Sequence, residues 1–267
     1  MNIDIAKVIR DKNERLYRRL PGFAIKALAR LICQDDINDV LARFGHLSGE
    51  DFVTAVLDDF GIERTVAGLD GLDRNGRYIF AANHPLGGLD AFVLAEAVAG
   101  HMGDVRLVVN DVLMKLEPLR PIFTPVNKYG IQNQEYMSAY NDLFASDLPV
   151  VYFPAGLCSR RNGGVICDLE WKKNFVQKAV ESGRDIVPVF VDAVNSQRFY
   201  RAASLRKSLG IPVNLELVLL PDELFRKKGS AIGLRFGEPV SHSSLRGGRH
   251  AASEAAELKK MCYDLRG

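Results

Sequence analysis

The side chains of His84 and Asp90 could transfer a proton together. They belong to the segment Ile79-Phe80-Ala81-Ala82-Asn83-His84-Pro85-Leu86-Gly87-Gly88-Leu89-Asp90. An imidazole has an ordinary pKa of about 6.5, so it can take a proton from a hydroxyl group near neutral pH. A carboxylate bonded to one ring nitrogen fixes the tautomer and leaves the other nitrogen free to act. We therefore take His84 as a candidate general base and Asp90 as the group that orients it.

The same pair also fits a structural interpretation. The segment reads as a buried strand over residues 79–82, then a Gly87-Gly88 turn, then a helix that starts near Asp90. Polar residues commonly satisfy turns, and aspartate commonly caps helices. In this interpretation His84 only forms hydrogen bonds within the turn, and Asp90 caps the helix. In the catalytic interpretation, Asn83, Gly87 and Gly88 shape the turn that holds the pair.

The elements that would position this pair alternate along the chain from residue 62 onward. We expect strands at 78–82, 105–109, 149–153, 186–191, 213–219 and 231–236. We expect helices near 89–99, 133–146, 171–182, 196–208 and 251–264. Such alternation predicts an α/β fold with a largely parallel central sheet flanked by helices. Ligands of such sheets bind beyond the carboxyl ends of the strands, which is where His84 would lie.

Residues 1–60 read as a helical N-terminal extension to an α/β core at 61–267, within one domain. Helical spacing is clearest at Ala24, Ala27, Leu28, Leu31 and Ile32. Residues 1–30 are basic, and the excess of lysine and arginine has two interpretations. These basic side chains either form a solvated helix face or contact anionic lipid at a membrane surface.

Composition narrows the classes of function. Apolar residues make up 47% and charged residues 25% of the chain, which are globular values. The net charge of +2 gives no reason to expect a nucleic-acid partner. The four cysteines form no CxxC pair and the histidines show no zinc-ligand spacing, so we expect no metal. No apolar run approaches the ~20 residues that span a bilayer, and charges recur through the N-terminus where a signal peptide would be apolar. We expect a cytoplasmic protein.

Four segments in order resemble the glycerolipid acyltransferase superfamily of the lysophosphatidic-acid type. Asn83-His84 with Asp90 resembles its first motif. The others are P-I-F-T-P-V-N-K at 121–128, F-P-A-G-L-C-S-R at 153–160 and I-V-P-V at 186–189. In that family the histidine deprotonates an acceptor hydroxyl, which attacks an acyl thioester, and the aspartate orients the histidine. The resemblance implies a transferase that needs no metal, no cofactor and no covalent intermediate.

Several positions depart from the family pattern. Five residues separate His84 from Asp90 where the family has four, and a Gly-Gly turn can absorb the extra residue because glycine tolerates positive φ. Ala155 replaces a glutamate and Cys158 replaces an arginine. Asn127 and Lys128 stand near another family arginine. These positions contact the phosphate-bearing acceptor in family members, so the changes argue against glycerol-3-phosphate or lysophosphatidate.

The two motifs NHPLGGLD and FPAGLxSR are more similar to a bacterial branch labelled "hemolysin". Some relatives of that branch make aminolipids by acylating the hydroxyl of an N-acyl amino acid such as N-(3-hydroxyacyl)glycine. The resemblance implies acyl transfer from acyl carrier protein or coenzyme A to a lipid-like acceptor, an N-acyl amino acid or a lysolipid, in phospholipid or aminolipid biosynthesis. The implied substrate-binding residues, besides those of the turn, are Asn127, Lys128, Gly156, Ser159 and Arg160.

Other assignments remain open. Arg160, Arg161, Lys172 and Lys173 could pair with an acceptor carboxylate or phosphate, attract an acidic carrier protein, or form a solvated rim. Cys158 could form a covalent acyl-enzyme with His84, or simply be a small buried side chain.

Two other classes of function would use the same residues. A thioesterase or lipid hydrolase would activate water with the His84–Asp90 pair, and a non-catalytic protein would only bind lipid at a membrane surface. Because the substrates are amphiphiles, we expect peripheral binding to the inner face of the cell membrane through the basic N-terminal helices.

Overall fold

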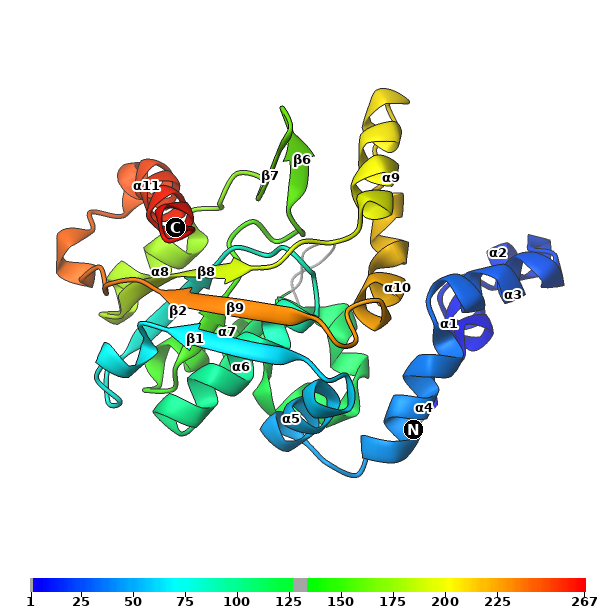
Figure 1. Ribbon diagram of the computed structural model, residues 1–267, viewed down its shortest axis with the longest axis horizontal. Coiled ribbons are helices and arrows are strands. Elements are labelled where there is room, and N and C mark those ends of the chain that lie inside the picture. The colour runs from blue at the N-terminus through cyan, green and yellow to red at the C-terminus, as the bar shows by residue number, and fades with distance from the viewer. Residues whose placement is uncertain (1, 127–133) are drawn as a thin grey trace.

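The computed structural model describes residues 2–126 and 134–267. Their centre is a seven-stranded sheet with the strand order β1-β9-β8-β2-β5-β3-β4 (Figure 1). Neighbouring strands are parallel except for the antiparallel pair β8 and β9. The strands are β1 (Glu63–Ala67), β2 (Tyr78–Ala82), β3 (Arg106–Asn110), β4 (Phe123–Val126), β5 (Val150–Tyr152), β8 (Asp185–Asp192) and β9 (Ala231–Phe236). This arrangement confirms the predicted largely parallel α/β fold.

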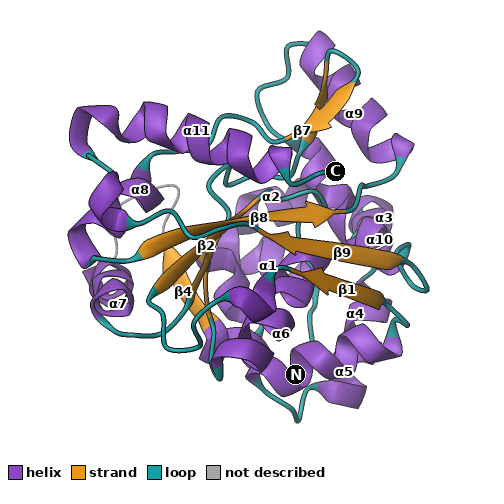
Figure 2. Ribbon diagram, turned by 60° about the vertical axis from the view of Figure 1, so that its left-hand side comes forward, coloured by secondary structure: helices purple, strands orange, loops and turns teal. Residues whose placement is uncertain are grey.

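Helices cover both faces of the sheet, and β2 shows why (Figure 2). Successive side chains of a strand point to opposite faces. Tyr78 and Phe80 pack into the core that includes α5 (Gly49–Asp59) and α6 (Leu89–Met102). Ile79 and Ala81 pack into the core on the other face, formed with α7 (Gln134–Ala145), α8 (Asn174–Ser182) and α11 (Ala251–Asp264). A strand buried on both faces reads as a continuous apolar run, which is the pattern of residues 79–82.

The first sixty residues are helical as predicted, in α1 (Ile5–Lys12), α2 (Glu14–Arg19), α3 (Gly22–Leu31), α4 (Gln34–Phe44) and α5. In Figure 1 the helices α1 to α3 lie apart from the sheet, at the right of the view. Helix α3 has no buried residue. Helix α5 differs, because Val53 and Leu57 are fully buried in the core with α6. The packed core therefore begins near the end of α4, where Val40 and Leu41 are buried, and continues through α5.

A separate layer follows β8 and lies beside the carboxyl end of β2. It contains α9 (Gln197–Ser208), the 3-10 helix η4 (Leu215–Leu219) and α10 (Leu220–Phe225). A two-stranded antiparallel hairpin of β6 (Arg160–Asn162) and β7 (Val165–Cys167) contacts α9. The other 3-10 turns are η1 (Leu69–Gly71), η2 (Asp111–Lys115), η3 (Glu117–Ile122), η5 (His242–Ser244) and η6 (Gly248–His250).

The strand predicted at 213–219 is wrong, because this segment forms η4 and leads into α10. The alternation of apolar and polar residues there does not match burial. Val213 and Leu215 are exposed, whereas Glu216 is buried against Arg160 and Arg206. The two buried ion pairs turn a polar side chain inward. The other predicted strands and the predicted helices are present with small shifts of their ends.

Within the described residues, no helix combines the length and apolar character needed to cross a membrane.

Candidate active site

Asn83 fastens the carboxyl end of β2 to the neighbouring strand β8. Its amide Nδ2 donates to the carbonyl of Val191 at 3.0 Å, and its Oδ1 accepts from the Val191 amide at 2.6 Å. The side chain is buried, so both bonds are protected from water. This pairing fixes where the chain leaves the sheet, immediately before His84.

The structure brings the His84 and Asp90 side chains together. Nδ1 of His84 lies 3.0 Å from Oδ2 of Asp90, a hydrogen-bond distance. The same Asp90 oxygen accepts from the amides of Leu86 at 2.9 Å and Gly87 at 3.1 Å. Helix α6 begins at Leu89 with Gly88 in the N-cap position. The other oxygen of Asp90, Oδ1, accepts from the amide of Ala91 in the first turn of α6 at 2.9 Å. The carboxylate therefore caps the start of the helix and also holds the loop and the imidazole.

Glycine at position 87 makes the five-residue spacing possible. Its φ of 85° lies in the left-handed region that side chains disfavour. A Cβ atom there would lie 2.5 Å from Sγ of Cys158 and 3.1 Å from Cδ1 of Leu220. Gly88 is also close to a neighbour, since its Cβ would lie 3.3 Å from Cδ1 of Leu224. A side chain at either position would therefore crowd a neighbouring residue, and the role of the two glycines at the site stays a prediction.

Two opposing effects set the proton affinity of His84. Burial lowers the pKa of the imidazole, but the charge of Asp90 and its hydrogen bond outweigh burial and raise that pKa above its ordinary value. Burial also acts against the Asp90 carboxylate, yet the imidazolium and the loop amides keep the Asp90 pKa below its ordinary value. The pair is therefore a charged carboxylate beside an imidazole that accepts a proton readily.

One ring nitrogen of His84 remains for chemistry. Because the Asp90 carboxylate can only accept, we assign the proton to Nδ1 of His84, which leaves the lone pair on Nε2. No group among the residues that the structure describes bonds to Nε2. The Phe153 ring stacks on the imidazole with 4.2 Å between centroids, and 16% of the His84 side chain is accessible. The ring is held on two sides and open on part of its surface.

Asp168 is a site residue that the sequence reasoning missed. This buried carboxylate accepts from the backbone amide of His84 at 3.1 Å, the Ser159 hydroxyl at 2.6 Å and Nε1 of Trp171 at 2.9 Å. Burial raises the Asp168 pKa despite these bonds. Asp168 thus links the histidine motif to the 153–160 segment. The amide of His84 lies 84 positions away in the chain, so no local pattern marks this contact.

Ser159 and Arg160, expected to bind substrate, are engaged with protein groups. Besides its bond to Asp168, Ser159 donates its backbone amide to the carbonyl of His84 at 2.8 Å. The Arg160 guanidinium lies 2.9 Å from Oε1 of Glu216 and donates to the carbonyl of Cys158 at 2.6 Å. Arg206 forms a second ion pair with Glu216, at 2.8 Å. The charge of Arg160 is therefore met by a buried carboxylate, and a role in holding the acceptor stays a prediction.

Cys158 has the setting of a small buried side chain. It is packed with Phe199 and Tyr200, and burial raises its pKa to about 12. A nucleophilic cysteine needs its thiolate, which is scarce at neutral pH under this condition. The geometry favours the packing interpretation of Cys158 over the covalent acyl-enzyme.

A cavity of about 590 Å³ adjoins the 153–160 segment. Its lining includes Ala155, Leu157, Trp171, Lys172 and Lys173. The Trp171 side chain thus reaches from this cavity to Asp168, within the histidine network. Gly156 is exposed between two of the lining residues and has a φ of 62°. Asn127 and Lys128 lie outside the described residues.

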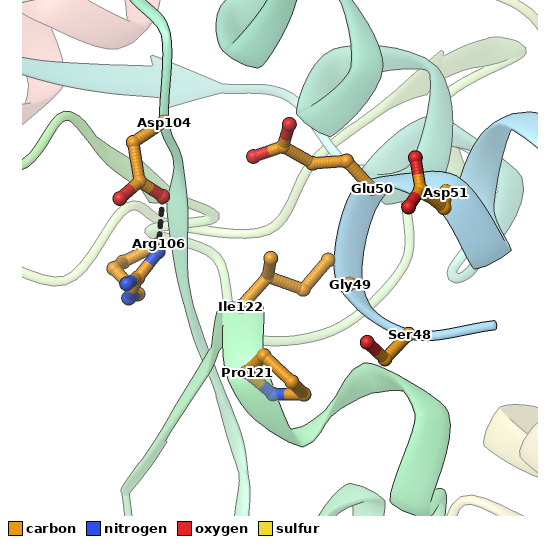
Figure 3. Close-up of a pocket in the computed structure, with 8 residues that line it drawn as sticks. All are labelled: Ser48, Gly49, Glu50, Asp51, Asp104, Arg106, Pro121 and Ile122. Carbon is orange, nitrogen blue, oxygen red and sulfur yellow. Dashed lines mark hydrogen bonds and ion pairs between the residues drawn. The ribbon is translucent and has the colours of Figure 1, made fainter.

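A second cavity, of about 270 Å³, lies at the start of α5 and contains none of these residues (Figure 3). Figure 3 shows Glu50 and Asp51 at the helix start, with Asp104 paired to Arg106 across the cavity. The described His, Cys, Asp and Glu side chains form no group that could hold a metal ion.

Comparison with known proteins identifies the family of this chain. A family profile described as Acyltransferase matches residues 7–266. The lyso-glycine lipid O-acyltransferase of Phocaeicola vulgatus is 38% identical over 98% of this chain and 95% of its own. The enzyme of the same name from Bacteroides thetaiotaomicron is 37% identical over 98% of this chain and 97% of its own. The crystal structure of a 1-acyl-sn-glycerophosphate acyltransferase from Thermotoga maritima aligns with a TM-score of 0.48 and 17% identity, over 92% of this chain and 93% of that one. The profile and the two curated relatives show that this chain belongs to the acyltransferase family.

Proposed function

We propose that the protein is an O-acyltransferase that moves a fatty acyl group from a thioester to a hydroxyl of a lipid-like acceptor, with His84 as general base. The observation that carries this proposal is the 3.0 Å contact between His84 and Asp90 on a partly open imidazole. Nε2 takes the hydroxyl proton while the oxygen attacks the thioester carbonyl. The carbon–sulfur bond then breaks as the ester forms, and the imidazolium returns the proton to the leaving thiolate.

The acceptor we propose is a lyso-glycine lipid or a close analogue, an N-acylated amino acid that carries a free hydroxyl. Both curated relatives are named for acylation of lyso-glycine lipid. Ala155 and Cys158 supply no charge where phosphate-binding relatives carry charged groups, and Arg160 is paired with Glu216. Lys172 and Lys173 at the cavity could still meet the single carboxylate of such an acceptor.

The proposed donor is acyl carrier protein or coenzyme A, and we propose no cofactor beyond that thioester. We further propose that the protein binds the inner face of the cell membrane peripherally. Helix α3 supports this, because it buries none of its apolar residues and Phe23 is 76% exposed. Helices α1 to α3 also carry several basic residues, which suits attraction to anionic lipid.

Purified protein tests the reaction directly. It is mixed with N-(3-hydroxyacyl)glycine and either acyl carrier protein thioester or acyl-coenzyme A, and the lipids are identified by mass spectrometry. The proposal predicts an O-acylated product and a free thiol in equal amounts. Free fatty acid with no acylated acceptor would assign the protein to the hydrolase class instead. Lipid binding without turnover, unchanged by His84→Ala, would assign it to the non-catalytic class.

A cellular measurement names the acceptor independently. In cells that lack the protein, the acylated lipid should disappear while its hydroxyl-bearing precursor accumulates. Accumulation of lysophosphatidate instead would show that the acceptor class is wrong, although the transferase assignment would stand.

A further inference from the structure

The far end of α9 presents apolar side chains to solvent. We call Leu205, Leu209, Val213 and Leu215, together with the cations Arg201 and Lys207, the α9 tip. Leu205 is 61% exposed and Leu209 65%, and Val213 and Leu215 are more than half exposed. In Figure 1 this end of α9 points away from the sheet. Exposed apolar side chains gathered in this way mark interaction surfaces more often than scattered ones do.

The fold does not use the apolar side chains of the tip. Helix α9 is held by its opposite face, where Phe199 and Tyr200 are fully buried against Cys158 and Leu220. The leucines at 205 and 209 are four residues apart, so they lie along one outward stripe. Their exposure therefore reflects something other than the packing of the helix.

The charges of α9 indicate the kind of partner. The helix carries four cations and no acidic residue. Two of the cations are neutralised within the protein, because Arg198 pairs with Asp222 at 2.7 Å and Arg206 with Glu216. Arg201 and Lys207 are exposed and have no ion pair within the described part of the chain. Arg201 is four residues before Leu205 and so lies on the same stripe as the leucines, whereas Lys207 lies on another side of the helix. An exposed apolar stripe that begins with an unpaired cation suits an anionic lipid surface, which offers hydrocarbon beside negative head groups.

The tip also connects to the candidate active site. The chain returns from it through η4 to α10, whose Leu220 and Leu224 stand against the catalytic turn. A Cβ atom at Gly87 would lie 3.1 Å from Leu220, and one at Gly88 would lie 3.3 Å from Leu224. The tip is therefore joined through η4 to the helix that packs against the turn of His84.

We propose that the α9 tip is a membrane-contact surface that inserts Leu205 and Leu209 into an anionic bilayer. It is separate from the N-terminal helices, which in Figure 1 lie on the other side of α10. The contact does not require the proposed acyl transfer to be correct.

The test compares full-length variants in binding to vesicles of phosphatidylglycerol and phosphatidylcholine. The double variant Leu205→Glu with Leu209→Glu places two acids at the apolar stripe, and it should bind about tenfold to a hundredfold more weakly. The matched control is Met261→Glu, an exposed apolar residue of α11 on the other side of the molecule, which should bind as the wild-type protein does. Circular dichroism shows that each variant is folded. Equal binding by the double variant and the wild-type protein would overturn the proposal.

A second readout reports insertion directly. Leu209→Trp introduces an indole at the tip, and bromine-labelled phosphatidylglycerol should quench its fluorescence, but not that of Met261→Trp. A bound but unquenched Leu209→Trp protein would refute insertion. Sedimentation gives another result that would refute insertion. If the wild-type protein is a dimer and the double variant is a monomer with unchanged vesicle binding, the tip contacts a second copy of the chain instead of lipid. Turnover of detergent-dispersed substrate is measured in parallel, and its absence in the wild-type protein would refute the proposed reaction without changing the vesicle result.

Discussion

The imidazole of His84 is subject to two influences of opposite sign, and their balance determines what it can do. Burial favours the neutral ring, whereas the Asp90 carboxylate favours the protonated ring and prevails. A raised pKa makes the ring a stronger base, but it also means that the ring is already protonated over a wider range of pH. The proposed reaction needs the neutral form, so the same carboxylate that orients the base also sets the pH at which it works.

The pH profile of acyl transfer should show this balance. The kcat/KM should fall as the pH is lowered through a pKa above 6.5, the ordinary value for histidine. In Asp90→Asn the charge that raises the pKa is gone while burial remains, so the midpoint of this acid limb should move to lower pH. Initial rates across a pH series measure both midpoints. A midpoint that stays in place or rises in Asp90→Asn would contradict the assigned pairing.

The Asp90→Asn variant should also be slower at its optimum, because the amide no longer fixes the imidazole as the carboxylate does. We expect a smaller loss than in His84→Ala, since the base itself remains. Steady-state rates at the optimum of each variant provide this comparison. A loss equal to that of His84→Ala would show that Asp90 does more than orient the ring.

At the scale of elements, the turn between His84 and α6 depends on glycine. Gly87→Ala should destabilise the protein by about 1–3 kcal/mol, because a positive φ disfavours side chains and the new methyl group would contact Cys158. The matched control is Gly100→Ala within α6, where a Cβ atom would meet nothing within 4 Å. That change should stabilise the helix by up to about 1 kcal/mol. Urea unfolding measures both, and equal stability of the two variants would show that the turn tolerates a side chain.

The Asp168 carboxylate joins segments that are far apart in the chain. Asp168→Ala removes the acceptor of the His84 amide, the Ser159 hydroxyl and the Trp171 indole. Leaving buried donors unpaired costs ~1–3 kcal/mol each. We therefore expect a loss of at least about 3 kcal/mol in the free energy of unfolding, with Asp168→Asn losing less because its carbonyl oxygen still accepts. Chemical denaturation of the two variants measures this order, and equal stability of Asp168→Ala and the wild-type protein would contradict it.

Elements with a strong local pattern were predictable from the sequence, and elements defined by distant partners were not. The apolar run 79–82 and the turn after it predicted β2, the glycine turn and the His84–Asp90 contact. Strand β1 escaped prediction because most of its residues are exposed, and β4 because Pro125 interrupts its short run. The 213–219 segment alternates like a strand, yet the ion pairs of Glu216 with two arginines decide its structure. Asp168 was missed for the same reason, since tertiary contacts alone give it a role.

At the scale of the whole molecule, the helices α1 to α3 form a basic surface away from the sheet. If this surface holds the protein on anionic lipid, binding to phosphatidylglycerol vesicles should weaken as salt rises, because the Debye length is only about 10 Å at 0.1 M and shorter at higher salt. Phe23→Glu should weaken binding further by placing an acid at the exposed apolar face of α3. Co-sedimentation at low and high salt measures both effects. Binding that is equal on neutral lipid and insensitive to salt would exclude electrostatic attachment.

The most direct measurement of the central claim is the rate of acyl transfer by His84→Ala. General-base assistance contributes about 10²–10⁴-fold in rate, so the account predicts a loss in that range while the unfolding midpoint stays close to that of the wild-type protein. The matched control is His46→Ala, an exposed histidine remote from the site in sequence, which should leave the rate unchanged. A folded His84→Ala protein that transfers acyl groups at the wild-type rate would contradict the account.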